Sequence, residues 1–218
     1  MKLKCVALIS FFGLALLLAL SAQEPGWAIG WYNGDWQSGI PGAPNWLLAP
    51  DNFARVYDQF QVPASGWTVV SVFSNDSISD AAAIATVSWE IRRGMAPGNG
   101  GELVASGTSP AIQSPDPAVT APPYPAPVVK THYRIQAGFL RLQLAAGSYW
   151  ISVTPSGVNT ATASPTLGAN AVGVDANGPH LALVDRAAGP RFAIAESAGR
   201  TGQVGRARYF SQGVIIAR

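Results

Sequence analysis

The chain has 218 residues, of which 48% are apolar and only 12% are charged, with 23 glycines, 17 prolines and a single cysteine. Its 14 basic and 12 acidic residues leave too little positive charge for a nucleic-acid-binding surface, so we expect no nucleic-acid partner. A lone cysteine excludes a disulfide framework, and few charges with many turn-forming residues are typical of a sheet protein.

The N-terminus has the pattern of a secretory signal peptide, which we place at residues 1–22. Lys2 and Lys4 precede an apolar run at 6–20, and small residues follow it. That run is short for a membrane span, which needs about 20 residues, and a retained anchor is the alternative. Cleavage removes both lysines and Cys5, which leaves 12 basic and 12 acidic residues. We expect a secreted, extracytoplasmic protein that has no membrane contact after cleavage.

Apolar and polar residues alternate with period two in four segments, which predicts half-buried strands at 84–92, 129–136, 139–144 and 149–153. A fifth segment, 66–74, is apolar on both faces and predicts a central strand. No long amphipathic helix pattern separates these segments. We therefore predict that residues 23–218 form one all-β domain with few helical residues, a single antiparallel two-sheet β-sandwich that is jelly-roll-like.

Two connections stand out in this predicted domain. Residues 107–127 contain seven prolines, and we predict a Pro-rich loop there because proline cannot donate to a sheet ladder. The segment 94–101 contains the Asn99-Gly100 pair, which is a hairpin signal, and it predicts a tight link between two strands.

Several segments are familiar when they are taken together. They are VYDQFQVPASGWTVVSVFSN (56–75), WEIRRGMAPGNGGELVASGTSP (89–110), LQLAAGSYWISVTP (142–155) and GANAVG (168–173). As a set they resemble bacterial exported β-sandwich domains of uncharacterised function, which occur in surface or secreted proteins with C-terminal sorting tails. The resemblance implies a jelly-roll-like sandwich and no particular activity. We expect no sorting tail here, because the chain ends in GVIIAR.

Aromatic residues are concentrated near the start of the predicted domain, where four of the seven tryptophans fall within 27–46. An aromatic face beside amides and carboxylates can stack on a sugar ring and bond to its hydroxyl groups. The candidate ligand-binding residues are Trp31, Tyr32, Asp35, Trp36 and Trp46. The alternative is that these rings close one end of the core, since large aromatic side chains are usually buried.

Asp58 shares an apolar row with Val56 and Phe60 in a predicted strand. A buried carboxylate is costly unless it has a partner. One interpretation makes Asp58 a ligand of a structural Ca²⁺, with further oxygen ligands from a neighbouring loop. The other is a buried aspartate that accepts backbone N–H bonds or pairs with an arginine. We expect no other metal or cofactor.

Charged residues form two further patterns. Lys130, His132 and Arg134 point the same way along one predicted strand, where they either bind an anion or form a solvated face. Glu90 and Glu102 flank one predicted hairpin, and two facing carboxylates are what a glycosidase requires. No other catalytic motif is present.

These observations predict a non-catalytic secreted module with a binding or structural role, whose expected partner is a glycan or another extracellular surface polymer. Two alternatives stay open. One is a self-associating surface or matrix protein that associates through sheet edges, and the other is a polysaccharide-acting jelly-roll enzyme. The oligomeric state is left open.

Overall fold

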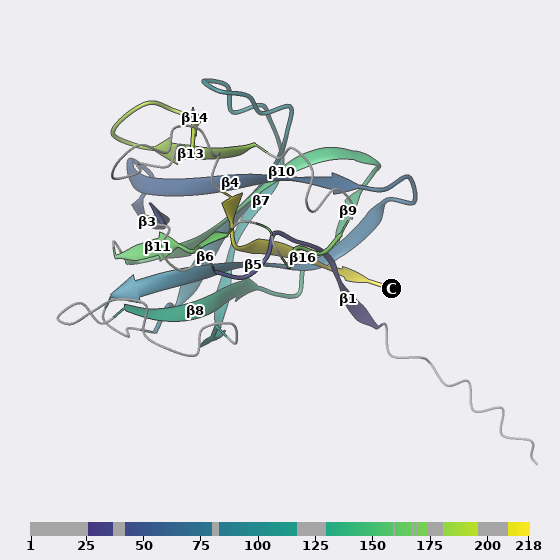
Figure 1. The fold of residues 1–218 in the computed structure, drawn as a ribbon, viewed down its shortest axis with the longest axis horizontal. Helices are drawn as coiled ribbons and strands as arrows, with labels where there is room; N and C mark the ends of the chain where they lie inside the picture. The colour runs from purple at the N-terminus through teal and green to yellow at the C-terminus, as the bar shows by residue number, and fades with distance from the viewer. Residues whose placement is uncertain are drawn as a thin grey trace, which may run out of the picture.

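The structure is a computed structural model that describes residues 26–36, 42–79, 83–116, 130–158, 160–166, 168, 170–173, 181–195 and 209–218. The signal peptide predicted at 1–22 lies outside these residues. Within them the chain forms β-strands and no α-helix (Figure 1). The first eight strands are β1 (Trp27–Tyr32), β2 (Ala43–Pro44), β3 (Trp46–Ala49), β4 (Asn52–Val62), β5 (Trp67–Ser79), β6 (Thr86–Arg93), β7 (Glu102–Pro115) and β8 (Lys130–Ala137). The others are β9 (Leu142–Leu144), β10 (Gly147–Ser156), β11 (Ala161–Ala163), β12 (Pro165–Thr166), β13 (Ala182–Arg186), β14 (Ala193–Ile194), β15 (Tyr209–Phe210) and β16 (Gln212–Ala217).

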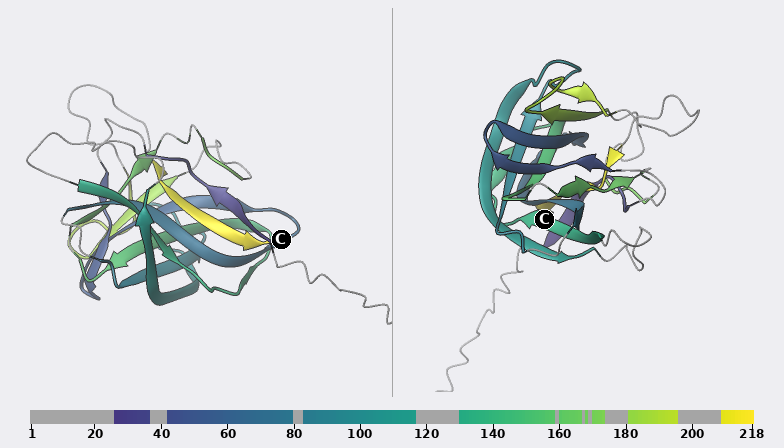
Figure 2. Two further views of the ribbon diagram at one scale, coloured as in Figure 1. Left: turned by 90° about the horizontal axis from the view of Figure 1, so that it is seen from below. Right: turned by 90° about the vertical axis from the view of Figure 1, so that its left-hand side faces the viewer.

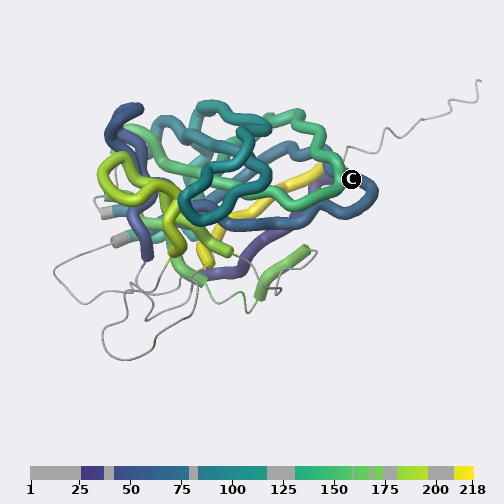
Figure 3. The backbone as a smooth tube through the Cα atoms, turned by 90° about the horizontal axis from the view of Figure 1, so that it is seen from above, coloured from purple at the N-terminus to yellow at the C-terminus, as the bar shows by residue number. Residues whose placement is uncertain are grey.

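Most of these strands belong to one sheet, in the order β1-β16-β5-β8-β7-β6-β10-β3-β4-β13-β14. Strands β9 and β11 also pair with β5, and β2 pairs with β11. Strands β12 and β15 form a separate two-stranded sheet. The pairings are antiparallel except for a parallel contact between β10 and β3. The first and last strands, β1 and β16, lie side by side (Figure 3). The all-β prediction is therefore confirmed. Strands β6, β8 and β10 lie where the alternation predicted them, and β5 lies where a central strand was predicted. Strand β9 covers only the last three residues of the strand predicted at 139–144.

Strand β7 explains why the main sheet is continuous. It pairs with β6 from Glu102 to Pro110 and with β8 from Ala111 to Pro115. The sheet consequently curls back on itself (Figure 2), where a sandwich of two separate sheets was predicted. We call the strands β1, β16, β5 and β8 the β5 half, and β6, β10, β3, β4 and β13 the β10 half.

The prediction of a loop at 107–127 is wrong for residues 107–115, which belong to β7. Pro110 lies where β7 leaves β6 and begins to pair with β8. A residue without an N–H is tolerated where a ladder changes partner, and this local break cannot be read from composition. Residues 117–129 lie outside the described part of the chain.

The main core lies between the two halves. Val72 and Ile135 of the β5 half pack in one apolar cluster with Phe60, Ile91 and Ile151 of the β10 half. Because side chains alternate across a strand, the residues next to these project from the outer face of each half. The candidate sites described below lie on those outer faces and in the polar part of the interior.

Candidate functional site

The five predicted ligand-binding residues differ in their exposure to solvent in the structure. Trp31 is fully buried and packs against Phe60, with ring centroids 5.7 Å apart. Tyr32 is also buried, and the half-buried Trp46 packs against the main core. The ring faces of these residues are therefore occupied by the protein itself. Asp35 and Trp36, which follow β1 and are partly exposed, are the remaining candidates for contact with a ligand.

Asp35 is held in place by hydrogen bonds from two directions. The Tyr32 hydroxyl donates to Asp35 Oδ1 at 2.5 Å, and the Asn170 amide donates to Asp35 Oδ2. The backbone N–H of Asp35 donates in turn to Asn170 Oδ1 at 2.7 Å. Burial raises the pKa of Tyr32 well above its usual value, and the hydrogen bond to Asp35 raises it further. Tyr32 is therefore a neutral donor that fixes the position of the carboxylate.

Trp36 lies on His132 of β8, with ring centroids 4.9 Å apart and planes inclined at 48°. Next along the strand, Arg134 lies over the Phe73 ring at 4.2 Å and donates from Nε to Asn75 Oδ1 at 3.2 Å. Two features that the sequence analysis treated as separate, the aromatic cluster and the basic ridge, therefore meet on the outer face of the β5 half. We call Tyr32, Asp35, Trp36, His132 and Arg134 the Trp36 cluster.

One interpretation of the row Lys130, His132 and Arg134 was a solvated strand face. That interpretation is wrong for His132, which is buried under Trp36. Its ring nitrogens lie 3.0 Å from Ser77 Oγ and 3.2 Å from Ser164 Oγ. A serine beside a histidine is a nucleophile–base geometry, but both hydroxyl-bearing residues are buried. Neither oxygen can meet a substrate from solvent, so these contacts position the ring.

The two glutamates considered for catalysis do not form a pair. Glu90 lies opposite Ser106, four positions along β7 from Glu102. Glu102 is exposed and is bound by Arg93, while Glu90 is buried on the outer face of the β10 half. At about 3.3 Å per strand residue, four positions correspond to about 13 Å along the sheet, which exceeds the separation of about 5–9.5 Å between the two carboxylates of a glycosidase.

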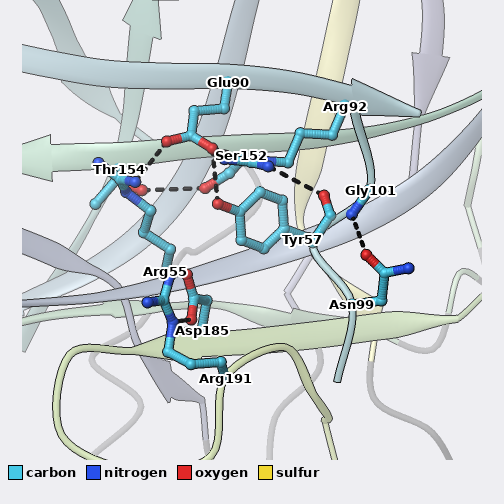
Figure 4. Close-up of polar contacts among 11 residues, drawn as sticks. Arg55, Tyr57, Glu90, Arg92, Asn99, Gly101, Ser152, Thr154, Asp185 and Arg191 are labelled. Atoms are coloured by element: carbon cyan, nitrogen blue, oxygen red, sulfur yellow. Dashed lines mark hydrogen bonds and ion pairs between the residues drawn. The ribbon is translucent and has the colours of Figure 1, made fainter. Parts of the chain in front are cut away.

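Glu90 instead belongs to a cluster of ion pairs (Figure 4). Its Oε1 accepts from Arg55 at 2.5 Å, and its Oε2 accepts from Arg92 Nε at 2.7 Å and from the Tyr57 hydroxyl at 2.9 Å. Burial alone would raise the pKa of Glu90, but Arg55, Arg92 and Tyr57 outweigh burial and lower it. Asp185 binds Arg191 close by. Glu90 was singled out in the sequence, but its partners were not, because Arg55 and Tyr57 come from a strand that is distant along the chain.

Asp58 is fully buried and accepts hydrogen bonds from nitrogen atoms. Its Oδ1 accepts from the backbone N–H of Phe210 at 3.1 Å and from Asn33 Nδ2 at 3.3 Å, and its Oδ2 accepts from Gln212 Nε2 at 2.8 Å. The interpretation as a buried aspartate that accepts backbone N–H bonds is confirmed. These donors do not fit a calcium ion, which needs oxygen ligands.

A second buried carboxylate, Asp76, completes a chain of polar groups through the interior. Gln212 Oε1 accepts from Val153 N at 3.0 Å, and Asn45 Nδ2 donates both to Val153 O and to Asp76, each at 2.9 Å. Burial raises the pKa of Asp58 and of Asp76 to about 7 against the effect of these hydrogen bonds. Asp76 shares one face of β5 with Val72, Ser74 and Ile78, so, like Asp58, it is a carboxylate in a partly apolar row that can be recognised in the sequence.

The comparisons with known proteins supply no relative. No family model matches the chain, and no significant match occurs among curated proteins or solved structures. In the described part of the chain, no three His, Cys, Asp or Glu side chains are grouped so that they could hold a metal ion. No helix among the same residues is long and apolar enough to cross a membrane.

Proposed function

We propose that this chain is a non-catalytic secreted binding module that contacts a hydroxyl-rich extracellular polymer, such as a polysaccharide, through Asp35 and Trp36. The observation that carries the proposal is the partly exposed Trp36 ring, which lies on His132 directly after Asp35 in the chain. A ring of this kind can stack on the C–H face of a sugar, and a neighbouring carboxylate can accept hydrogen bonds from hydroxyl groups.

The hydrogen bonds around Asp35 support the proposal because they reduce the cost of ordering the site on binding. Tyr32 and Asn170 already hold the carboxylate, and His132 already holds one face of Trp36. A preorganised site loses less conformational entropy when a ligand arrives. The scaffold in this proposal is a jelly-roll-like sandwich, supported by the two facing halves of the curled sheet. The signal peptide predicted at 1–22 supports secretion.

Affinity electrophoresis in gels that contain neutral polysaccharides tests this function. We expect retardation of the secreted protein and its loss in Trp36→Ala and Asp35→Ala, with unchanged near-UV circular dichroism. Trp27→Ala is the matched control, since Trp27 is 66% exposed and is not part of the Trp36 cluster. Equal retardation of the wild type and Trp36→Ala, or loss of retardation in Trp27→Ala alone, contradicts the proposal.

A second candidate function, self-association, is favoured by the edge formed by β1. Between Trp27 and Trp31, this strand pairs only with β16 among the described residues. Trp27 and Ile29 project from it with 66% and 43% of their surface exposed. The strand has neither a charged residue nor a proline, the usual features that prevent edge-to-edge pairing. Antiparallel pairing of β1 with the same strand of a second copy would extend the sheet across a two-fold axis.

Sedimentation equilibrium separates the two candidates. If the β1 edge mediates self-association, the wild type forms dimers as concentration increases and Ile29→Lys remains monomeric. The control is Phe139→Lys, which makes a similar change at a 91% exposed site outside the strands. A monomeric wild type at high concentration, or equal effects of the two variants, removes this candidate.

A further inference from the structure

We propose that Arg55, Arg92 and Arg191 form a binding site for an oxyanion, namely the carboxylate or sulfate group of an acidic polymer. Arg55 lies in β4 and Arg92 in β6, and Arg191 lies between β13 and β14 (Figure 4). The site is on the outer face of the β10 half. It does not depend on the Trp36 cluster, so it can be tested independently of the proposed function.

The charges in this region favour an anion. Three guanidinium groups face two carboxylates, because Arg55 and Arg92 share Glu90 while Arg191 pairs with Asp185. One positive charge is therefore left in excess. Arg191 also carries much of the accessible surface, since 55% of its side chain is exposed. An anion can approach it without displacing the buried pairs.

Arg55 has hydrogen-bonding capacity that the described chain does not use. A guanidinium group has five N–H donors, and Arg55 directs one of them to Glu90 Oε1. Its Nε is buried and has no acceptor among the described residues. A buried charged donor without an acceptor is unfavourable, so Nε favours an oxygen ligand once the side chains that cover it move aside.

Two phenylalanine rings fix how the guanidinium groups are presented. Phe53 has Arg55 at 5.0 Å and Arg191 at 5.6 Å from its ring centroid, and Phe192 has Arg191 at 5.2 Å and Arg92 at 5.7 Å. The rings and the arginines thus alternate. These cation–π contacts restrict the positions of the guanidinium groups. Arg191 donates from Nε and Nη2 to Asp185, so the N–H groups of its Nη1 are left for a carboxylate or sulfate oxygen.

The backbone at Phe192 shows that this ring is held in place at some cost. Phe192 has a φ of 48°, which is unusual for a bulky residue. Its carbonyl accepts from the N–H of Gly98 at 3.0 Å, and a Cβ on Gly100 would lie 2.4 Å from its ring. The 94–101 loop and the segment around Phe192 are therefore locked together. Strained conformations of this kind are concentrated at binding sites.

Isothermal titration calorimetry of the whole secreted protein tests the proposal, with trigalacturonate as the carboxylate probe, dextran sulfate as the sulfate probe and neutral dextran as the reference. We expect one or both acidic probes to bind at low salt and more weakly at 200 mM NaCl, since charge pairing is screened. Arg191→Gln should weaken binding at least fivefold. Arg93→Gln is the matched control, because Arg93 is 58% exposed and pairs with Glu102 outside the site; it should change affinity less than twofold.

A second measurement locates the anion. In ¹H–¹⁵N spectra that resolve arginine Nε signals, the Arg55 signal should shift during titration with the probe that binds, and the Arg93 signal should not. Absence of binding by both acidic probes at low salt, equal weakening by Arg191→Gln and Arg93→Gln, or an unshifted Arg55 signal overturns the proposal. Loss of polysaccharide binding in Trp36→Ala leaves it unaffected.

Discussion

Gln212 Nε2 donates a hydrogen bond to Asp58 Oδ2 at 2.8 Å, while Oε1 of the same amide accepts from a backbone N–H of β10. One side chain of the β5 half therefore binds both a buried carboxylate and a backbone N–H of the β10 half. All three hydrogen-bond partners of Asp58 are uncharged. Among the described residues the buried carboxylate thus has no cation as a direct partner, and this has measurable consequences for stability.

The first consequence is an unusual dependence of stability on pH. Burial raises the pKa of Asp58 and Asp76 from 3.8 to about 7 in the folded state. Between these values the folded state holds protons that the unfolded state has released, so the free energy of unfolding falls as pH rises. Each group contributes at most about 1.4 kcal/mol per pH unit. Its stabilisation is complete below pH 3.8 and is lost by about pH 7.

Glu90 has the opposite effect in a different range, because its pKa is lowered on folding from an ordinary value of 4.5. Its stabilisation of the fold is complete above that value and is lost only as the pH falls below it, so the two aspartates dominate between about pH 5 and 7. Urea denaturation from pH 4 to 8 should show stability falling across this window. Stability that rises from pH 5 to 7 would contradict the assignment.

Asp76→Asn separates the contribution of Asp76 to the pH dependence of stability from that of Asp58. The asparagine carbonyl can accept from Asn45, and its amide can donate to Ser74, whose hydroxyl can rotate. The titrating proton is removed while the hydrogen bonds are kept. We expect a flatter stability–pH curve and a variant more stable than the wild type at pH 8, as measured by urea midpoints. A curve parallel to that of the wild type would exclude Asp76 as a source of the slope.

Gln212→Ala should be strongly destabilising. It leaves Asp58 without one donor and the N–H of Val153 without its acceptor, both in the interior. Each unsatisfied buried group costs about 1–3 kcal/mol, so we expect a loss of about 3–5 kcal/mol in urea denaturation. Gln143→Ala is the control, because Gln143 bonds to Thr68 on the exposed surface. The prediction for Gln212 is wrong if the free energy of unfolding falls by similar amounts in the two variants.

Glu90→Gln should destabilise the fold more than Glu102→Gln, although each variant removes one carboxylate that is bound by arginine. Removing the charge of Glu90 leaves Arg55 and Arg92 facing each other in a partly buried setting, which should cost about 3–4 kcal/mol. Glu102 and Arg93 are exposed, and the loss there should be below about 1 kcal/mol. Thermal denaturation of both variants in parallel measures the difference. Comparable effects would show that the Glu90 cluster does not stabilise the fold.

Gly213→Ala tests the close packing of β16 on β5. A Cβ at this position would lie 2.3 Å from the ring of Phe73, which is fully buried and cannot move freely. Overpacking of this kind costs about 1–3 kcal/mol. In Gly26→Ala the new Cβ meets nothing within 4 Å, so stability should stay within about 0.5 kcal/mol of the wild type. Equal stability of both variants would place Phe73 elsewhere.

The sequence by itself determined where several of the strands lie and which of their side chains share a face. Alternation is a local property, because successive side chains of a strand point to opposite sides. It therefore located β6, β8 and β10, and it marked Asp58 as a carboxylate in an apolar row before any partner was known. The hydrogen bonds from uncharged groups confirm one of the two interpretations that the sequence left open.

Only the tertiary structure decided which strands are neighbours and which faces are covered. Trp31 and Trp36 look alike in the sequence, yet one fills the core and the other lies on His132. The physical reason is that burial depends on the curl of the sheet and on contacts between distant strands. Those contacts also join Asp58 to Gln212 across most of the chain and allow Pro110 to lie in a strand where the ladder changes partner.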